Sequence, residues 1–156
     1  MNRLRIGIAG LGRLGRRHAE ALAFSTRHVD LVAACSPVEA ERDFAGRELG
    51  IDADRLYSDF DAFIADPGLD AVVLVTPTTL HADQAIAALK AGKHVFIEKP
   101  LALNLPDCER VLAVAAEHPQ QVTMVGFVRR FDPSYRNAAA AVEAGEIGRP
   151  FLVRSQ

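Results

Sequence analysis

The sequence contains no tryptophan, only two cysteines and no long apolar run. Cys35 and Cys108 lack the C-x-x-C spacing of metal sites, so we expect no bound metal and two buried, reduced thiols. The segment 4–11 is short and broken by glycine, which excludes a signal peptide and a membrane helix of about 20 residues. These absences predict a cytoplasmic protein without a membrane partner.

An excess of charge of one sign is also absent. The chain has 18 Lys and Arg against 20 Asp and Glu, a formal net charge of −2, and neither sign forms a long run. This balance excludes nucleic acid and anionic membranes as expected partners. Its 156 residues, 49% of them hydrophobic, suffice for about one globular domain. We therefore expect a small-molecule partner.

Short apolar runs alternate with helical patterns along the whole chain. We expect strands at 4–9, 30–35, 71–75, 94–97 and 122–127, and a weaker strand at 55–57. We expect helices at 13–24, 37–49, 59–65, 80–91 and 105–117, with Ser58 and Asn104 as N-caps and Gly92 as a left-handed end. Continuous apolar strands separated by helices predict an α/β fold, a doubly wound parallel Rossmann sheet with helices on both faces.

A glycine pattern joins the first expected strand to the first expected helix. It reads Gly10-Leu11-Gly12-Arg13-Leu14-Gly15, the G-x-G-x-x-G spacing of dinucleotide-binding turns. Gly10 permits the tight turn, Gly12 lets the backbone approach a pyrophosphate, and Gly15 lets helix and strand pack closely. The free amides and the dipole of the helix start suit phosphate groups. The pattern predicts a site for NAD or NADP.

The choice between the two cofactors stays open at the end of the second expected strand. Many NAD-binding domains place an acid there for the ribose hydroxyls, whereas this chain has Ser36 followed by Pro37 and Val38. Ser36 removes a charge that would repel a 2′-phosphate. No arginine follows directly, and Arg42 would have to reach back from inside its helix. These residues therefore do not separate NAD from NADP.

The segment after the strand expected at 71–75 lies on the expected ligand side of the sheet. Thr76, Pro77, Thr78 and His81 can line the cofactor, although threonines can instead cap the helix and the histidine can bond its own loop. His18, on the apolar face of the first helix, is expected to be a satisfied core histidine.

The triplet Glu98-Lys99-Pro100 ends the apolar strand at 94–97. A lysine at this end of a parallel strand points into the ligand crevice. When a hydride leaves a secondary alcohol, the hydroxyl must lose its proton, and Lys99 can take that proton or donate a hydrogen bond to the oxygen. Lys99 is therefore the candidate catalytic residue, with an exposed surface lysine as the alternative. Glu98 can orient it.

Taken in order, these segments resemble the glucose-fructose oxidoreductase and inositol dehydrogenase family, often called Gfo/Idh/MocA. The resemblance covers the whole chain. It rests on the glycine turn continued by Arg16-Arg17-His18-Ala19, Thr76-Pro77 followed by His81, residues 91–95 leading to Glu98-Lys99-Pro100, and residues 126–133. The last segment, followed by Gly145-Glu146-Ile147-Gly148-Arg149-Pro150, looks most like members that oxidise inositols and related cyclic polyols.

The resemblance implies a two-domain oxidoreductase that transfers hydride from a cyclic polyol or sugar to the nicotinamide. Residues 1–127 would form the NAD(P)-binding Rossmann domain. Residues 128–156 would supply a connecting helix at 133–144 and a first strand at 151–156 of an incomplete α+β C-terminal domain. Likeness to inositol dehydrogenases favours NAD slightly and implies a homo-oligomer assembled through that second domain.

The family's second domain also supplies an Asp and a His that work with Lys99, and neither has a counterpart in this chain. We therefore expect these 156 residues to bind cofactor, with Glu98 and Lys99 beside it, but to turn nothing over alone. Arg129, Arg130 and Asp132 are candidates for the substrate side, and a structural ion-pair network is the alternative. A non-catalytic NAD(P)-binding sensor or interaction module is the rival function. The intact Glu98-Lys99-Pro100 argues against it.

Overall fold

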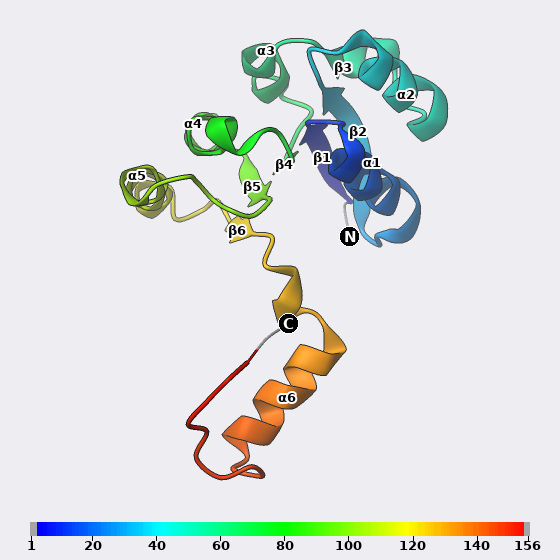
Figure 1. Cartoon of the computed structure of the whole chain (residues 1–156). Helices are drawn as coiled ribbons and strands as arrows, with labels where there is room; N and C mark the ends of the chain where they lie inside the picture. The colour runs from blue at the N-terminus through cyan, green and yellow to red at the C-terminus, as the bar shows by residue number, and fades with distance from the viewer. Residues whose placement is uncertain (1–2, 155–156) are drawn as a thin grey trace. The chain divides into compact units, whose positions relative to one another are not determined.

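The structure, a computed structural model, describes residues 3–154 (Figure 1). It divides the chain into two compact units, of which the first ends at Gly126 and the second begins at Phe127. The larger unit holds one parallel sheet with the strand order β3-β2-β1-β4-β5-β6, the order of a Rossmann fold. The predicted fold class is therefore confirmed.

The six expected strands are all present, with small differences at their ends. They are β1 Leu4–Ala9, β2 Val29–Cys35, β3 Leu56–Tyr57, β4 Ala71–Leu74, β5 His94–Ile97 and β6 Thr123–Val125. The expectation at 122–127 was too long, because β6 pairs with β5 only from Thr123 to Val125. The order reverses between β1 and β4, where such sheets open a crevice at their carboxyl ends.

The expected helices also form, and only the helix expected at 105–117 keeps its predicted bounds. They are α1 Arg13–Glu20, α2 Glu39–Leu49, α3 Phe60–Ile64, α4 Thr78–Lys90 and α5 Leu105–Glu117, with a 3-10 turn at Ala53–Arg55. The first helix does not stay α-helical to residue 24, since Ala21–Ser25 is a π-helix. This wider turn ends where the Thr26 hydroxyl donates to the Ala21 carbonyl at 2.8 Å. The helix expected from residue 80 already begins at Thr78.

The expected caps are partly confirmed. The Asn104 side chain accepts a hydrogen bond from the Asp107 amide, and Gly92 is left-handed with φ 76°. The prediction that Ser58 caps α3 was wrong, because the carboxylate of Asp59 accepts from the Ala62 amide instead. A carboxylate at this position also interacts favourably with the helix dipole.

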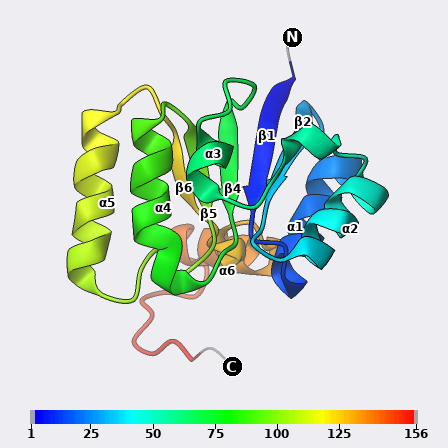
Figure 2. The same ribbon diagram turned by 90° about the horizontal axis from the view of Figure 1, so that it is seen from above.

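Helices lie on both faces of the sheet (Figures 1 and 2), and an apolar cluster of buried side chains lies on each face. Along β4, Val72 and Leu74 pack in the layer of α3, α4 and α5, whereas Ala71 and Val73 pack in the layer of α1 and α2. All four residues of β4 are buried. Because both faces of the central strands are covered, their sequences are continuously apolar, which is why the pattern predicted a parallel sheet.

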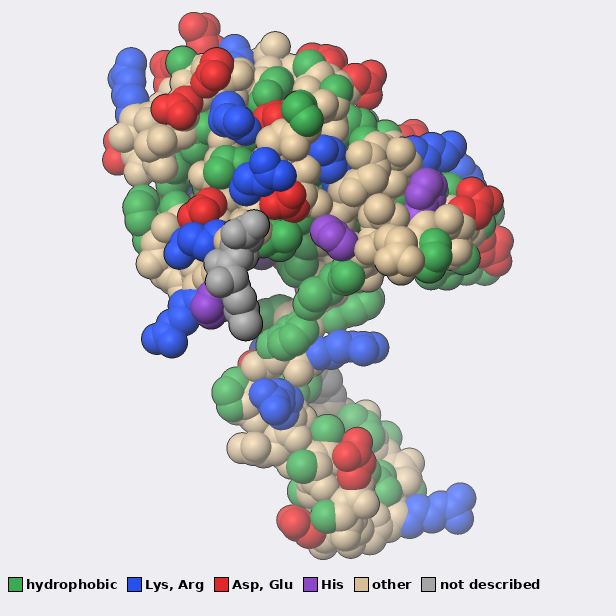
Figure 3. All heavy atoms as spheres, turned by 180° about the vertical axis from the view of Figure 1, so that it is seen from behind, with side chains coloured by type: hydrophobic (Ala, Val, Ile, Leu, Met, Phe, Trp, Pro, Cys, Tyr) green, Lys and Arg blue, Asp and Glu red, His purple; other side chains and the backbone are tan. Residues whose placement is uncertain are grey.

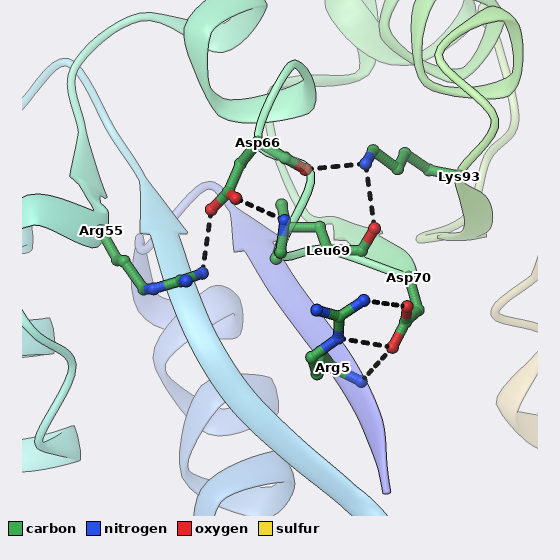
Figure 4. A network of polar contacts seen from close by, with 7 residues as sticks. Arg5, Arg55, Asp66, Leu69, Asp70 and Lys93 are labelled. Atoms are coloured by element: carbon green, nitrogen blue, oxygen red, sulfur yellow. Dashed lines mark hydrogen bonds and ion pairs between the residues drawn. The ribbon is translucent and has the colours of Figure 1, made fainter. Parts of the chain in front are cut away.

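Polar contacts hold the opposite, amino-terminal edge of the sheet (Figure 4). The Arg5 guanidinium donates to both carboxylate oxygens of Asp70, at 3.1 and 2.7 Å, and the Arg5 amide donates to one of them at 2.8 Å. Buried Lys93 donates from Nζ to the carbonyls of Asp66 and Leu69 at 2.7 and 2.9 Å. These contacts tie the starts of β1, β4 and β5 together, away from the carboxyl edge.

Asp70 provides a pH-dependent part of the stability. The hydrogen bonds from the Arg5 side chain and amide lower the pKa of Asp70 to about 2. An unfolded Asp titrates near pH ~4, so this contribution is complete above that pH and is lost as the pH falls toward about 2. We expect Asp70→Asn to lower the free energy of unfolding at pH 7 by about 1 kcal/mol, since the pair is partly exposed. Urea unfolding at pH 7 and pH 3 measures this, and the difference from wild type should shrink at pH 3.

Asp83→Asn is the matched control for this prediction. Asp83 also pairs with an arginine, Arg110, but 73% of its side chain is exposed. We expect it to change stability by less than about 0.5 kcal/mol. Equal effects of the two substitutions at both pH values would contradict the role given to Asp70.

The second unit contains a 3-10 turn at Val128–Arg130 and helix α6 at Pro133–Glu143. The helix expected at 133–144 is therefore present. The strand expected at 151–156 does not form over residues 151–154, and residues 155 and 156 lie outside the described residues. A strand needs a neighbour to satisfy its amides and carbonyls, and the described part of this unit contains no other strand. The assignment of 128–156 to a second domain remains a prediction.

Charges of both signs are interspersed over the face of the larger unit seen in Figure 3. This agrees with the sequence, in which neither sign forms a long run. Between residues 3 and 154, no helix is long and apolar enough to span a membrane.

Candidate cofactor-binding site

A cavity of about 570 Å³ opens at the carboxyl ends of β1, β2 and β4. The glycine turn forms one side of it, and the segment after β2 and the start of α4 form others. Its lining includes Gly10, Leu11, Gly12, Ser36, Thr76 and Pro77 among the residues expected to bind the cofactor. The cavity lies at the point where the strand order reverses, which is the ligand position of this fold.

The three glycines of the turn differ in what a side chain at each position would meet. Gly10 has φ 88°, and a Cβ there would lie 2.6 Å from the Val75 carbonyl oxygen. A Cβ at Gly15 would lie 1.9 Å from the Gly10 carbonyl oxygen, whereas one at Gly12 would meet no atom within 4 Å. Gly10 and Gly15 are therefore required by the fold itself, while Gly12 leaves room beside the cavity.

The start of α1 offers free hydrogen-bond donors next to this room. No side chain caps α1, and the Arg16 amide donates to the Gly12 carbonyl at 2.9 Å as the first bond of the helix. The amides that precede Arg16 in the first turn have no acceptor inside the helix. The side chains of Arg13 and Leu14 are exposed and do not line the cavity. The backbone amides of these two residues belong to the first turn of α1, where free amides suit a phosphate group.

Ser36 is buried beside the cavity and is held in place by hydrogen bonds to Glu41, Val38 and Arg42. Its hydroxyl donates to the Glu41 carboxylate at 2.5 Å and accepts from the Val38 amide at 3.1 Å, and its carbonyl accepts from Arg42 Nη1 at 2.7 Å. Glu41 lines the cavity and Arg42 does not. Arg42 does reach back to the end of β2, but its charge is directed at a backbone carbonyl. The carboxylate of Glu41 is a site residue that the sequence reading missed.

The cysteine that precedes Ser36 is also part of the cavity wall. Cys35 is buried, and burial raises the pKa of its thiol to about 12. A thiol with so high a pKa is unreactive near neutral pH. Cys108 is only half-buried, so the expectation of two buried thiols holds for Cys35 alone.

The loop after β4 is ordered by side chains that the sequence singled out. Thr76 and Pro77 line the cavity, and the Thr76 hydroxyl donates to Gln84 Oε1 at 2.5 Å. Thr78 is the first residue of α4 and lies outside the lining, and no threonine caps this helix, whose N-cap is Pro77. The capping alternative is therefore wrong.

His81 lies beneath this loop with 2% of its surface exposed. Its Nδ1 is 2.8 Å from the Pro100 carbonyl oxygen and its Nε2 is 2.9 Å from the Thr76 carbonyl oxygen. The ring therefore connects the loop after β4 to the loop after β5. This is the local hydrogen bonding that is the alternative to a direct cofactor contact.

Lys99 follows β5 at the same carboxyl edge, and its side chain is exposed. The Lys99–Pro100 peptide bond is cis. Glu98 Oε2 accepts from the Lys99 amide at 3.0 Å, and Glu98 Oε1 lies 2.8 Å from His18 Nε2. His18 is only half-buried, so it is not a core histidine. It instead connects α1 to the segment that carries Lys99, a contact between residues 80 positions apart.

The three substrate candidates belong to the second unit and interact among themselves and their neighbours. Asp132 caps α6 by accepting from the amides of Ser134 and Tyr135, and it pairs with Arg129 at 3.1 Å. The Arg130 guanidinium lies 5.7 Å from the centre of the Phe127 ring. These contacts show the local network that was the alternative. A role toward substrate remains a prediction.

The strand order, the glycine turn and the cavity at the switch point define a dinucleotide-binding domain. The chain belongs to the Gfo/Idh/MocA family, described as "Oxidoreductase family, NAD-binding Rossmann fold", which matches residues 4–127. The predicted family is thereby confirmed, and the Rossmann domain is of the NAD-binding kind.

Inositol dehydrogenases are among the relatives that share this domain. The chain is 40% identical over 153 residues to scyllo-inositol 2-dehydrogenase (NAD(+)) of Bacillus subtilis, covering 98% of this chain and 44% of that enzyme. It is 40% identical to myo-inositol 2-dehydrogenase of Thermotoga maritima, over 97% of this chain and 44% of that one. The crystal structure of scyllo-inositol dehydrogenase from Lactobacillus casei with bound NAD(H) and scyllo-inositol superposes with a TM-score of 0.91 at 44% identity, over 94% of this chain and 43% of that one. The chain thus spans less than half the length of these relatives.

Proposed function

We propose that this chain is the cofactor-binding part of an NAD-dependent dehydrogenase that oxidises a secondary alcohol of an inositol-like cyclic polyol. The observation that carries the proposal is the joint placement of the glycine turn and Lys99 at one carboxyl edge of the sheet. The three relatives described above, named as inositol dehydrogenases, support the substrate class.

The residues of the cavity fit the proposed cofactor. Gly12 leaves open space where a side chain would stand, and the uncapped start of α1 presents amides for the pyrophosphate. Thr76 and Pro77 border the same cavity from the loop after β4. When bound, the nicotinamide supplies the hydride acceptor.

Lys99 is proposed to handle the proton of the substrate hydroxyl. As the hydride leaves carbon, charge develops on the oxygen, and Nζ of Lys99 either takes the proton or donates a hydrogen bond to that oxygen. Glu98 holds the Lys99 backbone through the amide, and His18 holds Glu98 in turn. These two residues position Lys99 without themselves exchanging the proton. Glu98, Thr78 and His81 are proposed to lie around the cofactor, at the carboxyl edge that also carries Lys99.

The rest of the enzyme belongs to the same proposal. A second domain would complete the active site, bind the polyol and assemble the homo-oligomer, with Arg129, Arg130 and Asp132 on the substrate side. We place the complete enzyme in the cytoplasm. The free thiols of Cys35 and Cys108 support a reducing compartment.

Calorimetric titration of the 156-residue chain with NADH tests the cofactor part of the proposal. We expect saturable binding with a dissociation constant on the order of 10 μM and no oxidation of myo- or scyllo-inositol by the chain alone. Gly12→Ala is the informative variant. Its φ of −63° suits alanine and no atom lies near the added methyl, so the fold should persist while binding weakens at least about 10-fold.

Thermal unfolding of both proteins serves as the control for folding. If a folded wild-type chain binds no NADH, or if Gly12→Ala binds as tightly as wild type, the glycine turn is structural and the proposal fails. Turnover of an inositol by the complete enzyme then separates a dehydrogenase from the rival sensor module.

A further inference from the structure

After β2 this chain has Ser36 where many NAD-binding domains have an acid that contacts the adenine ribose. A carboxylate from another element, that of Glu41, lies beside Ser36. Glu41 belongs to the first turn of α2, five residues after Ser36, and lines the cavity. Its Oε2 accepts from the Ser36 hydroxyl at 2.5 Å. Glu41 of α2 therefore places a negative charge at the end of β2, where Ser36 stands instead of the usual acid.

Ser36 is built to hold this carboxylate in place. It is 2% exposed, its hydroxyl accepts from the Val38 amide at 3.1 Å, and the hydroxyl proton is thereby left for Glu41. Such a charge-assisted bond is short and directional. No residue between 3 and 154 donates to Oε1, the other carboxylate oxygen of Glu41. Because Glu41 lines the cavity, its carboxylate can accept from a ligand there.

The neighbouring Arg42 does not direct its charge at Glu41 in the cavity. Arg42 Nη1 donates to the Ser36 carbonyl at 2.7 Å, and Arg42 is not part of the lining. A 2′-phosphate at the ribose position would face a carboxylate without a directed arginine. Ribose hydroxyls, which are donors, would instead find an acceptor.

We propose that Glu41, held by Ser36, is the residue that selects NAD over NADP in this chain. The inference rests on the proposed cofactor site. It assigns the acidic function to a helix residue rather than to the strand end. Glu41 accepts from the adenine-ribose hydroxyls and repels a 2′-phosphate, because like charges in a partly buried site repel strongly.

The test compares NADH and NADPH binding to the 156-residue chain by calorimetry. For wild type we expect NADH to bind about 100-fold more tightly than NADPH. Glu41→Gln keeps the shape and removes the charge, so NADH binding should weaken and NADPH binding should strengthen. The preference should fall to less than about 5-fold. Ser36→Ala, which releases the carboxylate, should reduce the preference to an intermediate value.

Glu39→Gln is the matched control. Glu39 lies in the same helical turn, is exposed and does not line the cavity, so its substitution removes the same charge from the same dipole. We expect it to leave the preference within 2-fold of wild type. A general loss of folding moves both cofactors alike and leaves their ratio unchanged, which separates a structural effect from selection.

Three results would overturn the inference while leaving the cofactor site intact. They are equal binding of both cofactors by wild type, an unchanged preference in Glu41→Gln, or an equal shift in Glu39→Gln. A folded wild-type chain that binds neither cofactor would instead refute the proposed function itself.

Discussion

Replacing Lys99 with methionine should lower kcat of the complete enzyme on an inositol by about 1,000-fold, the range of positioned acid–base catalysis. Methionine keeps an unbranched chain and removes the ammonium. Lys99 is exposed, and no described residue accepts a hydrogen bond from its Nζ, so neither the fold nor NADH binding to the 156-residue chain depends on that group. We expect the NADH dissociation constant to change by less than about 3-fold. Steady-state kinetics and calorimetry measure the two effects.

Two companion variants interpret the loss. Lys90→Met removes an exposed lysine at the end of α4 and should leave kcat unchanged. Lys99→Arg keeps a positive charge that does not lose its proton. If Lys99 takes the proton, the arginine variant should be as inactive as Lys99→Met. If it only donates a hydrogen bond, the arginine variant should retain substantial activity. A Lys99→Met enzyme with wild-type kcat would remove Lys99 from the mechanism.

Gly15→Ala should lower the free energy of unfolding of the chain by about 3 kcal/mol. The added methyl would lie 1.9 Å from the Gly10 carbonyl oxygen and 2.8 Å from its carbon, atoms that cannot move without opening the turn. The close packing of α1 against β1 would be lost. Urea denaturation followed by circular dichroism gives the change in stability directly.

Gly50→Ala separates this clash from the ordinary cost of losing a glycine. Gly50 has φ 71° at the end of α2, and a Cβ there would meet no atom within 4 Å. Only the backbone conformation is penalised, so we expect a loss of about 1 kcal/mol. Equal losses at the two positions would show that the contact with Gly10 is not what requires glycine at position 15.

The sequence predicted the sheet because its determinants are local. Runs such as Ala71–Leu74 are apolar throughout, Gly92 marks the end of α4, and Asn104 marks the start of α5. The glycine turn was predictable for the same reason, since its spacing alone encodes the strand-turn-helix geometry. Over residues 151–154, the described part of the strand expected at 151–156, no strand forms, because a strand depends on a partner that no local pattern supplies.

The polar partners of the site were less predictable than the fold. Glu98 was expected near Lys99, but nothing in the spacing shows that His18, 80 positions earlier, would pair with it. Glu41 was overlooked because a glutamate in the first turn of a helix is explained by the helix dipole alone. A cue was present in retrospect. Glu41 lies only five residues after Ser36, in the first turn of α2, so its side chain can reach back to the strand end that carries Ser36.

The buried ring of His81 has a consequence for how quickly a ligand can enter and leave. Because it connects the carbonyls of Thr76 and Pro100, the two loops beside the crevice are fixed to each other before any cofactor arrives. The conformational entropy of these loops is lost when the chain folds, so cofactor binding does not have to order them again. Binding to such a preformed wall resembles the docking of rigid bodies, in which the association rate is set by diffusion and orientation rather than by loop closure. A dehydrogenase built on this domain can therefore exchange oxidised for reduced cofactor between turnovers without first remodelling these loops.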